Sequence, residues 1–212
     1  MDFDQFLSVI SKLDRSDTGG FYSHLKMIPK ERIIPGLDEI RNRNPRKAAV
    51  LALFYPDKNN ETLFLLILRA DYDGTHAAQI GFPGGKFETN DLSLKRTALR
   101  ETFEEVGVRM EYVKVKKRLT DTFIPPSNFI VRPYLGVIEF TPEFSMNHEV
   151  QEIIEVKLAD LLNETFVSTK NLTTSYMQNI DVPCFELNNR TVWGATAMML
   201  SEIKDLIRAH LH

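Results

Sequence analysis

The chain has 212 residues, of which 43% are hydrophobic, enough to build one domain with a sizeable core. The formal net charge of -3 argues against nucleic acid or an anionic membrane as the main partner. The single cysteine, Cys184, excludes an intramolecular disulfide and a cysteine-based zinc site, and we expect it to be a buried thiol. The acidic N-terminus and the short apolar runs indicate neither a targeting sequence nor a membrane helix, so we expect a cytoplasmic protein.

The first part of the chain predicts a helical extension. Apolar residues recur at helical spacing over residues 2–13, and a second, short helix is predicted at Leu37–Arg41, between prolines. We therefore expect an N-terminal extension, residues 1–47, packed on a main domain of residues 48–212. One basic group in the extension is interpreted as solvated, with phosphate binding as the less favoured alternative: Arg41, Arg43, Arg46 and Lys47.

The main domain alternates predicted strands and helices. Ala48–Tyr55 and Thr62–Arg69 predict two buried strands that form a hairpin, followed by a loop at residues 70–81. Further predicted elements are strands at 113–119 (an edge strand), 130–140 and 150–156, a helical turn at 158–162, a hairpin at 185–193 around Asn188-Asn189, and a last helix at 195–208 with core positions Leu200, Ile203 and Ile207. Mixed strands with helices on both sides predict one α/β/α sandwich.

Residues 82–108 contain the most informative stretch of the chain. It opens with Pro83-Gly84-Gly85, a tight turn at which the backbone can approach a ligand closely. Asn90 and Asp91 are candidates to cap the following helix, and for Asp91 we prefer capping over orienting a nearby arginine. Gly107 predicts the end of this helix.

The predicted helix has two different faces. At 100° per residue, Glu105 lies about 40° to one side of Glu101 and Glu104 lies about 60° to the other. The opposite side carries the predicted core positions, Leu92, Leu99, Phe103 and Val106. Like charges at this spacing repel, whereas crowded carboxylates suit Mg²⁺ or Mn²⁺. A solvated acidic face is the simpler alternative, but it explains neither the glycine turn nor Arg100 beside the glutamates.

This stretch resembles the Nudix box, the signature of the Nudix hydrolases. Arg100–Val108 matches the second half of the box, Arg-Glu-apolar-x-Glu-Glu-x-Gly-apolar, with Thr102 at the apolar position. The first half has one extra residue, and Asp91 stands where the box has Glu, which is similar to the coenzyme A diphosphatase branch. The resemblance implies the Nudix α/β/α fold and a metal-dependent hydrolase that cuts a diphosphate bond.

Other segments resemble the same branch, so that the resemblance covers about residues 45–208. They are Phe82-Pro83-Gly84-Gly85, Pro126–Phe129 with Pro133–Gly136, and Val192–Ala197 at the entry into the last helix. Two positions depart from the branch motif: Gly74 stands in place of an arginine, and Ala78 in place of a glycine.

Site residues follow from the helix face and from the resemblance. We expect Glu101 and Glu105 to be the main metal ligands and Glu104 to complete the group, and the resemblance implies that the Gly84 carbonyl also reaches a metal. Arg100 is expected to pair with a neighbouring carboxylate and fix its orientation.

The catalytic base and the substrate contacts are less constrained by the sequence. Glu149 is the candidate base, and a solvated charge in a loop is almost as good an interpretation of this residue. Glu104 is the alternative base. Phe129 and Tyr134 are interpreted as core residues in preference to a stacking role. The candidate substrate-binding residues are Arg69, His76, Gln79 and Phe82, with a structural role equally open for His76.

The expected activity is hydrolysis of a nucleoside diphosphate linked to a group X, with Mg²⁺ or Mn²⁺ as cofactor. Coenzyme A or its derivatives, cut to phosphopantetheine and adenosine 3′,5′-bisphosphate, are the leading substrates. Hydrolysis of ADP-ribose, NADH or a nucleoside triphosphate is an alternative, and a non-catalytic nucleotide-binding module is an alternative of another class. We expect a small-molecule nucleotide as partner, no nucleic acid, no membrane, and a monomer or homodimer.

Overall fold

The computed structural model describes residues 1–13, 20–70, 79–174 and 177–211. The helices are α1 (Phe3–Lys12), α2 (Gly20–Leu25), α3 (Leu37–Asn42), α4 (Leu94–Val106), α5 (Leu158–Leu162) and α6 (Gly194–Ala209). The strands are β1 (Arg46–Pro56), β2 (Thr62–Arg69), β3 (Ile80–Gly81), β4 (Gly84–Lys86), β5 (Lys114–Arg118), β6 (Thr122–Ile124), β7 (Phe129–Val137), β8 (Val150–Lys157), β9 (Val167–Thr174), β10 (Met177–Leu187) and β11 (Arg190–Trp193). No helix in these ranges is long and apolar enough to cross a membrane.

The central sheet is mixed, as predicted. Its main path runs β3-β2-β1-β7-β5, with β8 on β2, β4 on β1 and β6 on β7. β1 and β2 form the predicted antiparallel hairpin, with Phe54 opposite Phe64, whereas β1 and β7 run parallel. β5 lies at the end of the path and is the predicted edge strand. β2 pairs with β1 only at the C-terminal end of β1, next to the hairpin turn. The N-terminal half of the same edge of β1 pairs with β4, and Gly84 lies opposite Val50 there.

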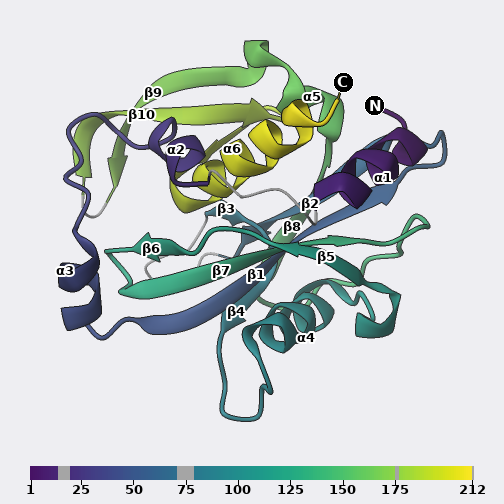
Figure 1. The fold of residues 1–212 in the computed structure, drawn as a ribbon, viewed down its shortest axis with the longest axis horizontal. Helices are drawn as coiled ribbons and strands as arrows, with labels where there is room; N and C mark the ends of the chain where they lie inside the picture. The colour runs from purple at the N-terminus through teal and green to yellow at the C-terminus, as the bar shows by residue number, and fades with distance from the viewer. Residues whose placement is uncertain (14–19, 71–78, 175–176, 212) are drawn as a thin grey trace.

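A second, three-stranded sheet has the order β11-β10-β9. The predicted Asn188-Asn189 turn joins β10 to β11, and both residues have positive φ (49° and 58°), as asparagines tolerate in a tight hairpin. β9 and the first part of β10 were not predicted, because residues 168–174 are mostly polar and give no strand signal. Figure 1 shows this sheet and α6 on one face of the central sheet and α4 on the other, so the architecture is α/β in layers.

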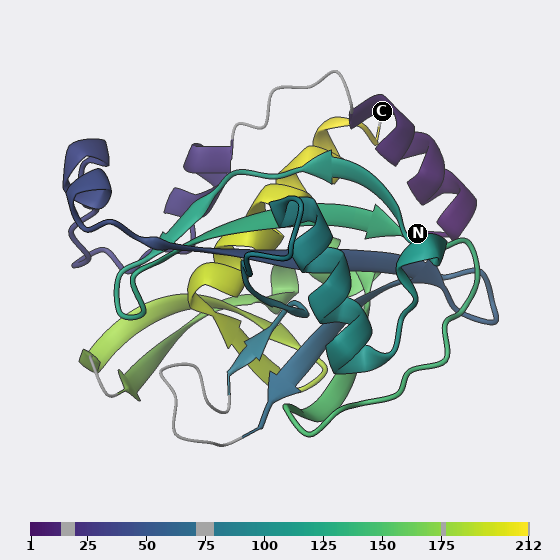
Figure 2. The same ribbon diagram turned by 90° about the horizontal axis from the view of Figure 1, so that it is seen from below.

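Strand alternation in β1 divides the core into two halves. Ala52 and Phe54 pack toward α6 and α1, whereas Leu51 and Leu53 pack toward α4. The predicted N-terminal helix is present as α1, and its Phe6 ring stacks on Phe54 with ring centroids 4.8 Å apart. Seen from below, α4 lies across the strands of the central sheet (Figure 2). The helix with the acidic face therefore covers the opposite side of the sheet from α6.

Candidate functional site

Gly84 and Gly85 lie so close to the backbone of β1 and to the Glu101 carboxylate that neither position has space for a side chain. Gly84 has φ of 150°, and a Cβ there would lie 2.3 Å from the carbonyl oxygen of Ala49. A Cβ on Gly85 would lie 2.4 Å from Cδ of Glu101. Glycine at these two positions therefore allows β4 to pack against both β1 and α4. The predicted close approach of this turn to a ligand stays a prediction.

The caps of α4 differ in part from prediction. Ser93 caps the helix, because its hydroxyl accepts a hydrogen bond from the Arg96 N–H at 3.2 Å, and the predicted caps Asn90 and Asp91 are wrong. Asp91 lies three residues before the helix begins and binds side chains instead. Gly107, with φ of 77°, ends the helix as predicted.

The buried face of α4 is rotated relative to the predicted one. Leu99 and Val106 are buried, but Leu92 is 95% exposed and Phe103 is 45% exposed, so the core assignment of those two residues is wrong. Leu92 precedes the first helical residue, so helical periodicity does not apply to it. The sheet contacts the arc that contains Ala98 and Thr102, which turns Phe103 toward solvent.

Glu105 is the most deeply buried of the three glutamates, with only 1% of its side chain exposed. Its Oε2 accepts a hydrogen bond from the Gly84 N–H at 2.7 Å, and its Oε1 lies 3.3 Å from Nη1 of Arg69 without forming a hydrogen bond among the described residues. Burial raises the pKa of Glu105 to about 7, although Arg69 and the Gly84 N–H act in the opposite direction. The charge of Glu149 also raises this pKa, as the smallest of the named causes.

Arg100 connects the other two glutamates to Asp91. Its Nη1 lies 3.0 Å from Glu101 and 2.8 Å from Glu104, and its Nε and Nη2 donate to the two carboxylate oxygens of Asp91 at 3.0 and 2.9 Å. Arg100 thus pairs with neighbouring carboxylates, as expected. Asp91 binds Arg100, which was the alternative to the preferred capping role of Asp91. The guanidinium hydrogen bonds lower the pKa of Asp91 to about 2, while burial chiefly raises the pKa of Glu101.

The oxygen atoms around Gly84 have the chemistry that a hard divalent cation requires. Glu101, Glu105 and the Gly84 carbonyl supply oxygen donors only, and one carboxylate oxygen of Glu105 is buried without a hydrogen-bond partner. Arg69 donates to the Gly84 carbonyl at 2.6 Å, so it holds one of the two acceptor positions of that oxygen. Within the described ranges, no three acidic, histidine or cysteine side chains already converge as a metal site.

A cleft of about 880 Å³ lies on the α6 side of the central sheet. Three of the predicted substrate-binding residues, Arg69, Gln79 and Phe82, line it together with Gly84. His76, Gly74 and Ala78 lie outside the described residues. The α4 glutamates are not among the described lining residues; they reach the cleft only through their contacts with Gly84, Gly85 and Arg69.

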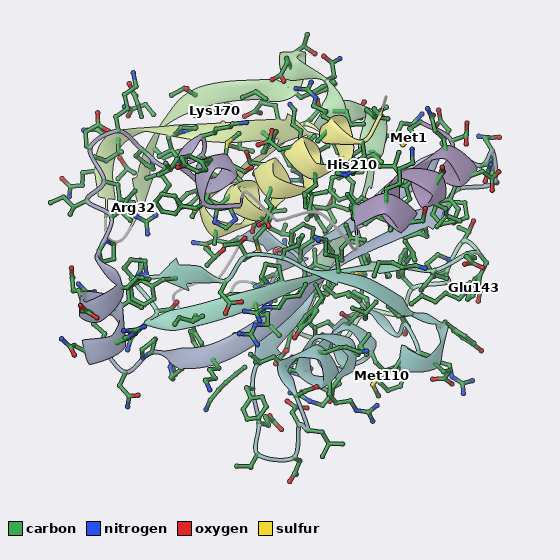
Figure 3. The ribbon with its side chains drawn as sticks, in the orientation of Figure 1. Met1, Arg32, Met110, Glu143, Lys170 and His210 are labelled. Atoms are coloured by element: carbon green, nitrogen blue, oxygen red, sulfur yellow. The ribbon has the colours of Figure 1, made fainter. Side chains whose placement is uncertain are left out.

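Much of the cleft wall comes from segments to which no site residue had been assigned. The extension contributes Pro29, Glu31, Arg32 and Ile33, and Figure 3 shows Arg32 of this segment between α3 and the layer of β10. β10 contributes Gln178, Ile180 and Val182. The end of β11 and the start of α6 contribute Trp193, Gly194, Ala195, Thr196, Met198 and Met199. The resemblance of Val192–Ala197 to a known motif was a signal for the last of these. Residues 29–33 carry no comparable signal, because their position depends on the path of the chain after α2.

The loop before β8 places Glu149 beside the C-terminal end of α4. The Asn147 N–H donates to the backbone carbonyl of Glu105 at 3.1 Å, and the Ser145 N–H donates to that of Val106 at 3.0 Å. The Asn147 side chain in turn accepts from the Glu149 N–H at 2.9 Å. These bonds fix the backbone of Glu149, while its side chain is partly exposed.

Comparisons with known proteins identify the family of the chain. The NUDIX domain family matches residues 45–175. The uncharacterised Nudix hydrolase NudL of Yersinia pestis is 31% identical over 144 residues, covering 68% of this chain and 71% of that protein, and NudL of Yersinia pseudotuberculosis matches with the same figures. A solved MutT/nudix family protein from Enterococcus faecalis has the same fold, with a TM-score of 0.53 and 15% identity, covering 94% of this chain and 73% of that chain. The chain therefore belongs to the Nudix family and is a Nudix hydrolase, one of a class that acts on nucleoside diphosphate derivatives and generally uses divalent metal ions.

Proposed function

We propose that this Nudix hydrolase cuts the diphosphate of coenzyme A or its derivatives, giving phosphopantetheine and adenosine 3′,5′-bisphosphate. The observation that carries the proposal is the size of the cleft beside Gly84. Its volume of about 880 Å³ is near the upper end of the range for small-molecule sites, and it extends from β4 to α6 and the N-terminal extension. That space suits a nucleotide with a long second arm. The extra residue and Asp91 in the box support the same substrate.

Glu101, Glu105 and the Gly84 carbonyl would hold the metal, and Glu104 would complete the group. The buried, unpartnered oxygen of Glu105 and the oxygen-only donor set support this assignment. When bound, Mg²⁺ or Mn²⁺ neutralises charge on the diphosphate oxygens. Arg69 then has a second role in the proposal: once it releases Gly84, its guanidinium lies in the cleft wall and can bind the diphosphate bidentately.

Arg100 is proposed as a positioning residue. It is held by Asp91 through two hydrogen bonds and contacts both Glu101 and Glu104, so it fixes the directions in which those carboxylates point. This arrangement is supported by burial, because the side chain of Asp91 is only 3% exposed.

Glu149 is proposed as the general base. It would take a proton from the water that attacks one phosphorus atom; the bond from that phosphorus to the bridging oxygen breaks, and the bridging oxygen leaves with the other phosphate. Its fixed backbone and its electrostatic effect on Glu105 support the role. Gln79 and Phe82, which line the cleft, are proposed to contact the substrate, and the same role is proposed for His76.

The test is a side-by-side assay of coenzyme A, dephospho-coenzyme A, ADP-ribose and NADH at equal concentration with Mg²⁺ or Mn²⁺. Products are separated by chromatography, and we expect phosphopantetheine and adenosine 3′,5′-bisphosphate from coenzyme A. The same assay on Glu149→Gln, with Glu111→Gln as a surface control, tests the base: only the first substitution should lower kcat, because Glu111 is exposed and pairs with Arg109.

The outcomes separate the alternatives. Rapid hydrolysis of ADP-ribose without any cleavage of coenzyme A refutes the proposed substrate and leaves the Nudix chemistry intact. If neither these four compounds nor nucleoside triphosphates turn over with Mn²⁺ present, a nucleotide-binding role replaces the catalytic one.

A further inference from the structure

Arg46 is the one member of the basic group in the extension that is among the described lining residues of the cleft. Arg41 and Arg43 pair with carboxylates of α3. Arg46, at the start of β1, lines the cleft instead: its guanidinium carbon lies 4.1 Å from the ring centroid of Phe129, and its Nη2 donates to the Ser127 carbonyl at 3.0 Å. Stacking on an aromatic ring holds a guanidinium in one plane while leaving its outer edge available to a ligand.

Arg46 and Gly84 line the same cleft, but the register of β1 places Arg46 at a distance from Gly84. Arg46, Ala48 and Val50 alternate onto one face of the strand, and all three line the cleft. Val50 is opposite Gly84, and Arg46 lies four residues earlier in the strand, a distance of about 13 Å along it. A substrate whose diphosphate lies at Gly84 therefore reaches Arg46 only with a group beyond the diphosphate.

Ser127 provides an independent sign of a ligand at this end of the cleft. The residue lines the cleft and is 7% exposed, yet its hydroxyl has no hydrogen-bond partner among the described residues. A buried hydroxyl without a partner is unfavourable, and rotation toward a bound acceptor relieves that cost.

The charge of the cleft favours an anionic ligand. Among its described lining residues, four are basic and one, Glu31, is acidic, the basic ones being Arg32, Arg46, Arg69 and Lys86. The whole chain has a net charge of -3, so this excess is a property of the cleft. Phe129 adds aromatic surface beside Arg46, and Phe123 adds more elsewhere in the cleft wall. Aromatic surface and positive charge suit a nucleoside carrying a phosphate.

We propose that Arg46, held on Phe129 and assisted by Ser127, binds a phosphomonoester on the ribose of the substrate, apart from the diphosphate that is cut. This subsite makes the enzyme prefer a nucleotide with such a group. It rests on the proposed function for the identity of the group, which is then the 3′-phosphate of coenzyme A.

The test compares the binding of adenosine 3′,5′-bisphosphate with that of adenosine 5′-phosphate. Binding is measured by calorimetry in metal-free buffer, where no hydrolysis occurs. These ligands differ only in the 3′-phosphate. The wild-type protein should bind the bisphosphate about tenfold more tightly, the size of one hydrogen bond to a charged group. Arg46→Met should abolish that ratio with the affinity for the monophosphate unchanged, and Ser127→Ala should reduce it. Arg41→Met is the matched control, because Arg41 is exposed and does not line the cleft.

Equal affinities for the two ligands in the wild-type protein, or no measurable binding of the bisphosphate, overturn the subsite. So does an unchanged ratio in a folded Arg46→Met protein, with folding checked by circular dichroism. The proposed function fails separately, if coenzyme A is not hydrolysed. Conversely, coenzyme A and dephospho-coenzyme A hydrolysed with equal kcat/KM would leave the proposed function standing and the subsite refuted.

Discussion

Arg100 and Asp91 form a two-point ion pair across nine residues of chain, with Nε to Oδ1 at 3.0 Å and Nη2 to Oδ2 at 2.9 Å. Asp91 also accepts hydrogen bonds from the Thr97 hydroxyl and the Glu88 N–H. The carboxylate therefore fastens the loop after β4 to the second turn of α4. Because Arg100 also contacts Glu101 and Glu104, the same pair links the stability of the loop to the geometry of the acidic face.

Asp91→Asn is expected to destabilise the protein by about 2 kcal/mol at neutral pH, because it weakens hydrogen bonds to a charged, largely buried partner. The folded-state pKa of Asp91, about 2, is below its ordinary value of 3.8. Its stabilising contribution is therefore full above pH 4 and is lost as the pH falls toward 2. Urea unfolding of both proteins between pH 2 and pH 7 measures the difference.

Asp38→Asn is the control for that experiment, since Asp38 also faces an arginine but is 92% exposed. We expect almost no change in its free energy of unfolding. A difference between wild type and Asp91→Asn that stays constant down to pH 2 would show that the charge of Asp91 is not what stabilises the loop.

Glu101→Gln and Glu105→Gln are each expected to lower kcat by about a hundredfold or more, because each removes a charged oxygen ligand. The fold should survive, and in metal-free buffer the Tm of Glu105→Gln should rise, since a buried charge and its repulsion from Glu101 are removed. Product release and thermal melts measure both effects. Wild-type turnover in either variant contradicts the ligand assignment.

Removal of metal by a chelator should abolish activity, and added Mg²⁺ or Mn²⁺ should restore it. Either ion should also raise the Tm of the wild-type protein, because a ligand that binds only the folded state stabilises it. The rise should be smaller in Glu105→Gln, which leaves fewer charged donors. Full activity after dialysis against chelator is incompatible with the proposed cofactor.

The two glycines of β4 should respond differently to alanine. Gly84→Ala forces a Cβ against the backbone of β1 at positive φ, so we expect a loss of about 3 kcal/mol or more in stability. In Gly85→Ala the three atoms nearest to the new Cβ belong to the side-chain carboxylate of Glu101, which can move, so the fold should persist while kcat falls. Denaturant unfolding and kinetic assays of both variants separate the effects; equal destabilisation would contradict this contrast.

The N-terminal extension should be part of the cooperative fold. Phe6 is fully buried against Phe54, so Phe6→Ala is expected to lower the free energy of unfolding by about 3 kcal/mol. Phe103→Ala, at a 45% exposed position, should change it by less than about 1 kcal/mol. A small effect at Phe6 would instead support an extension that is only loosely attached.

Local signals in the sequence were enough to predict several elements and the acidic face. The spacing of Phe3, Phe6 and Ile10 predicts α1, and Gly107 marks the end of α4, because periodicity and caps depend on neighbours within one or two turns. The glutamate spacing and the resemblance to the Nudix box indicated the chemistry before any fold was known. The same local reasoning placed Leu92 in the core, which is wrong because α4 begins after it.

Only the tertiary structure decided which distant residues meet. Arg69 contacts Gly84 and Glu105 because β2 ends beside β4, and Arg46 lies on Phe129 because β1 and β7 run parallel in that register. Spacing along the chain carries no information about such contacts, since they depend on strand order and on the path of the connecting segments. The cleft itself is made in this way, from the extension, the central sheet and α6, and so its shape was beyond the reach of the sequence pattern.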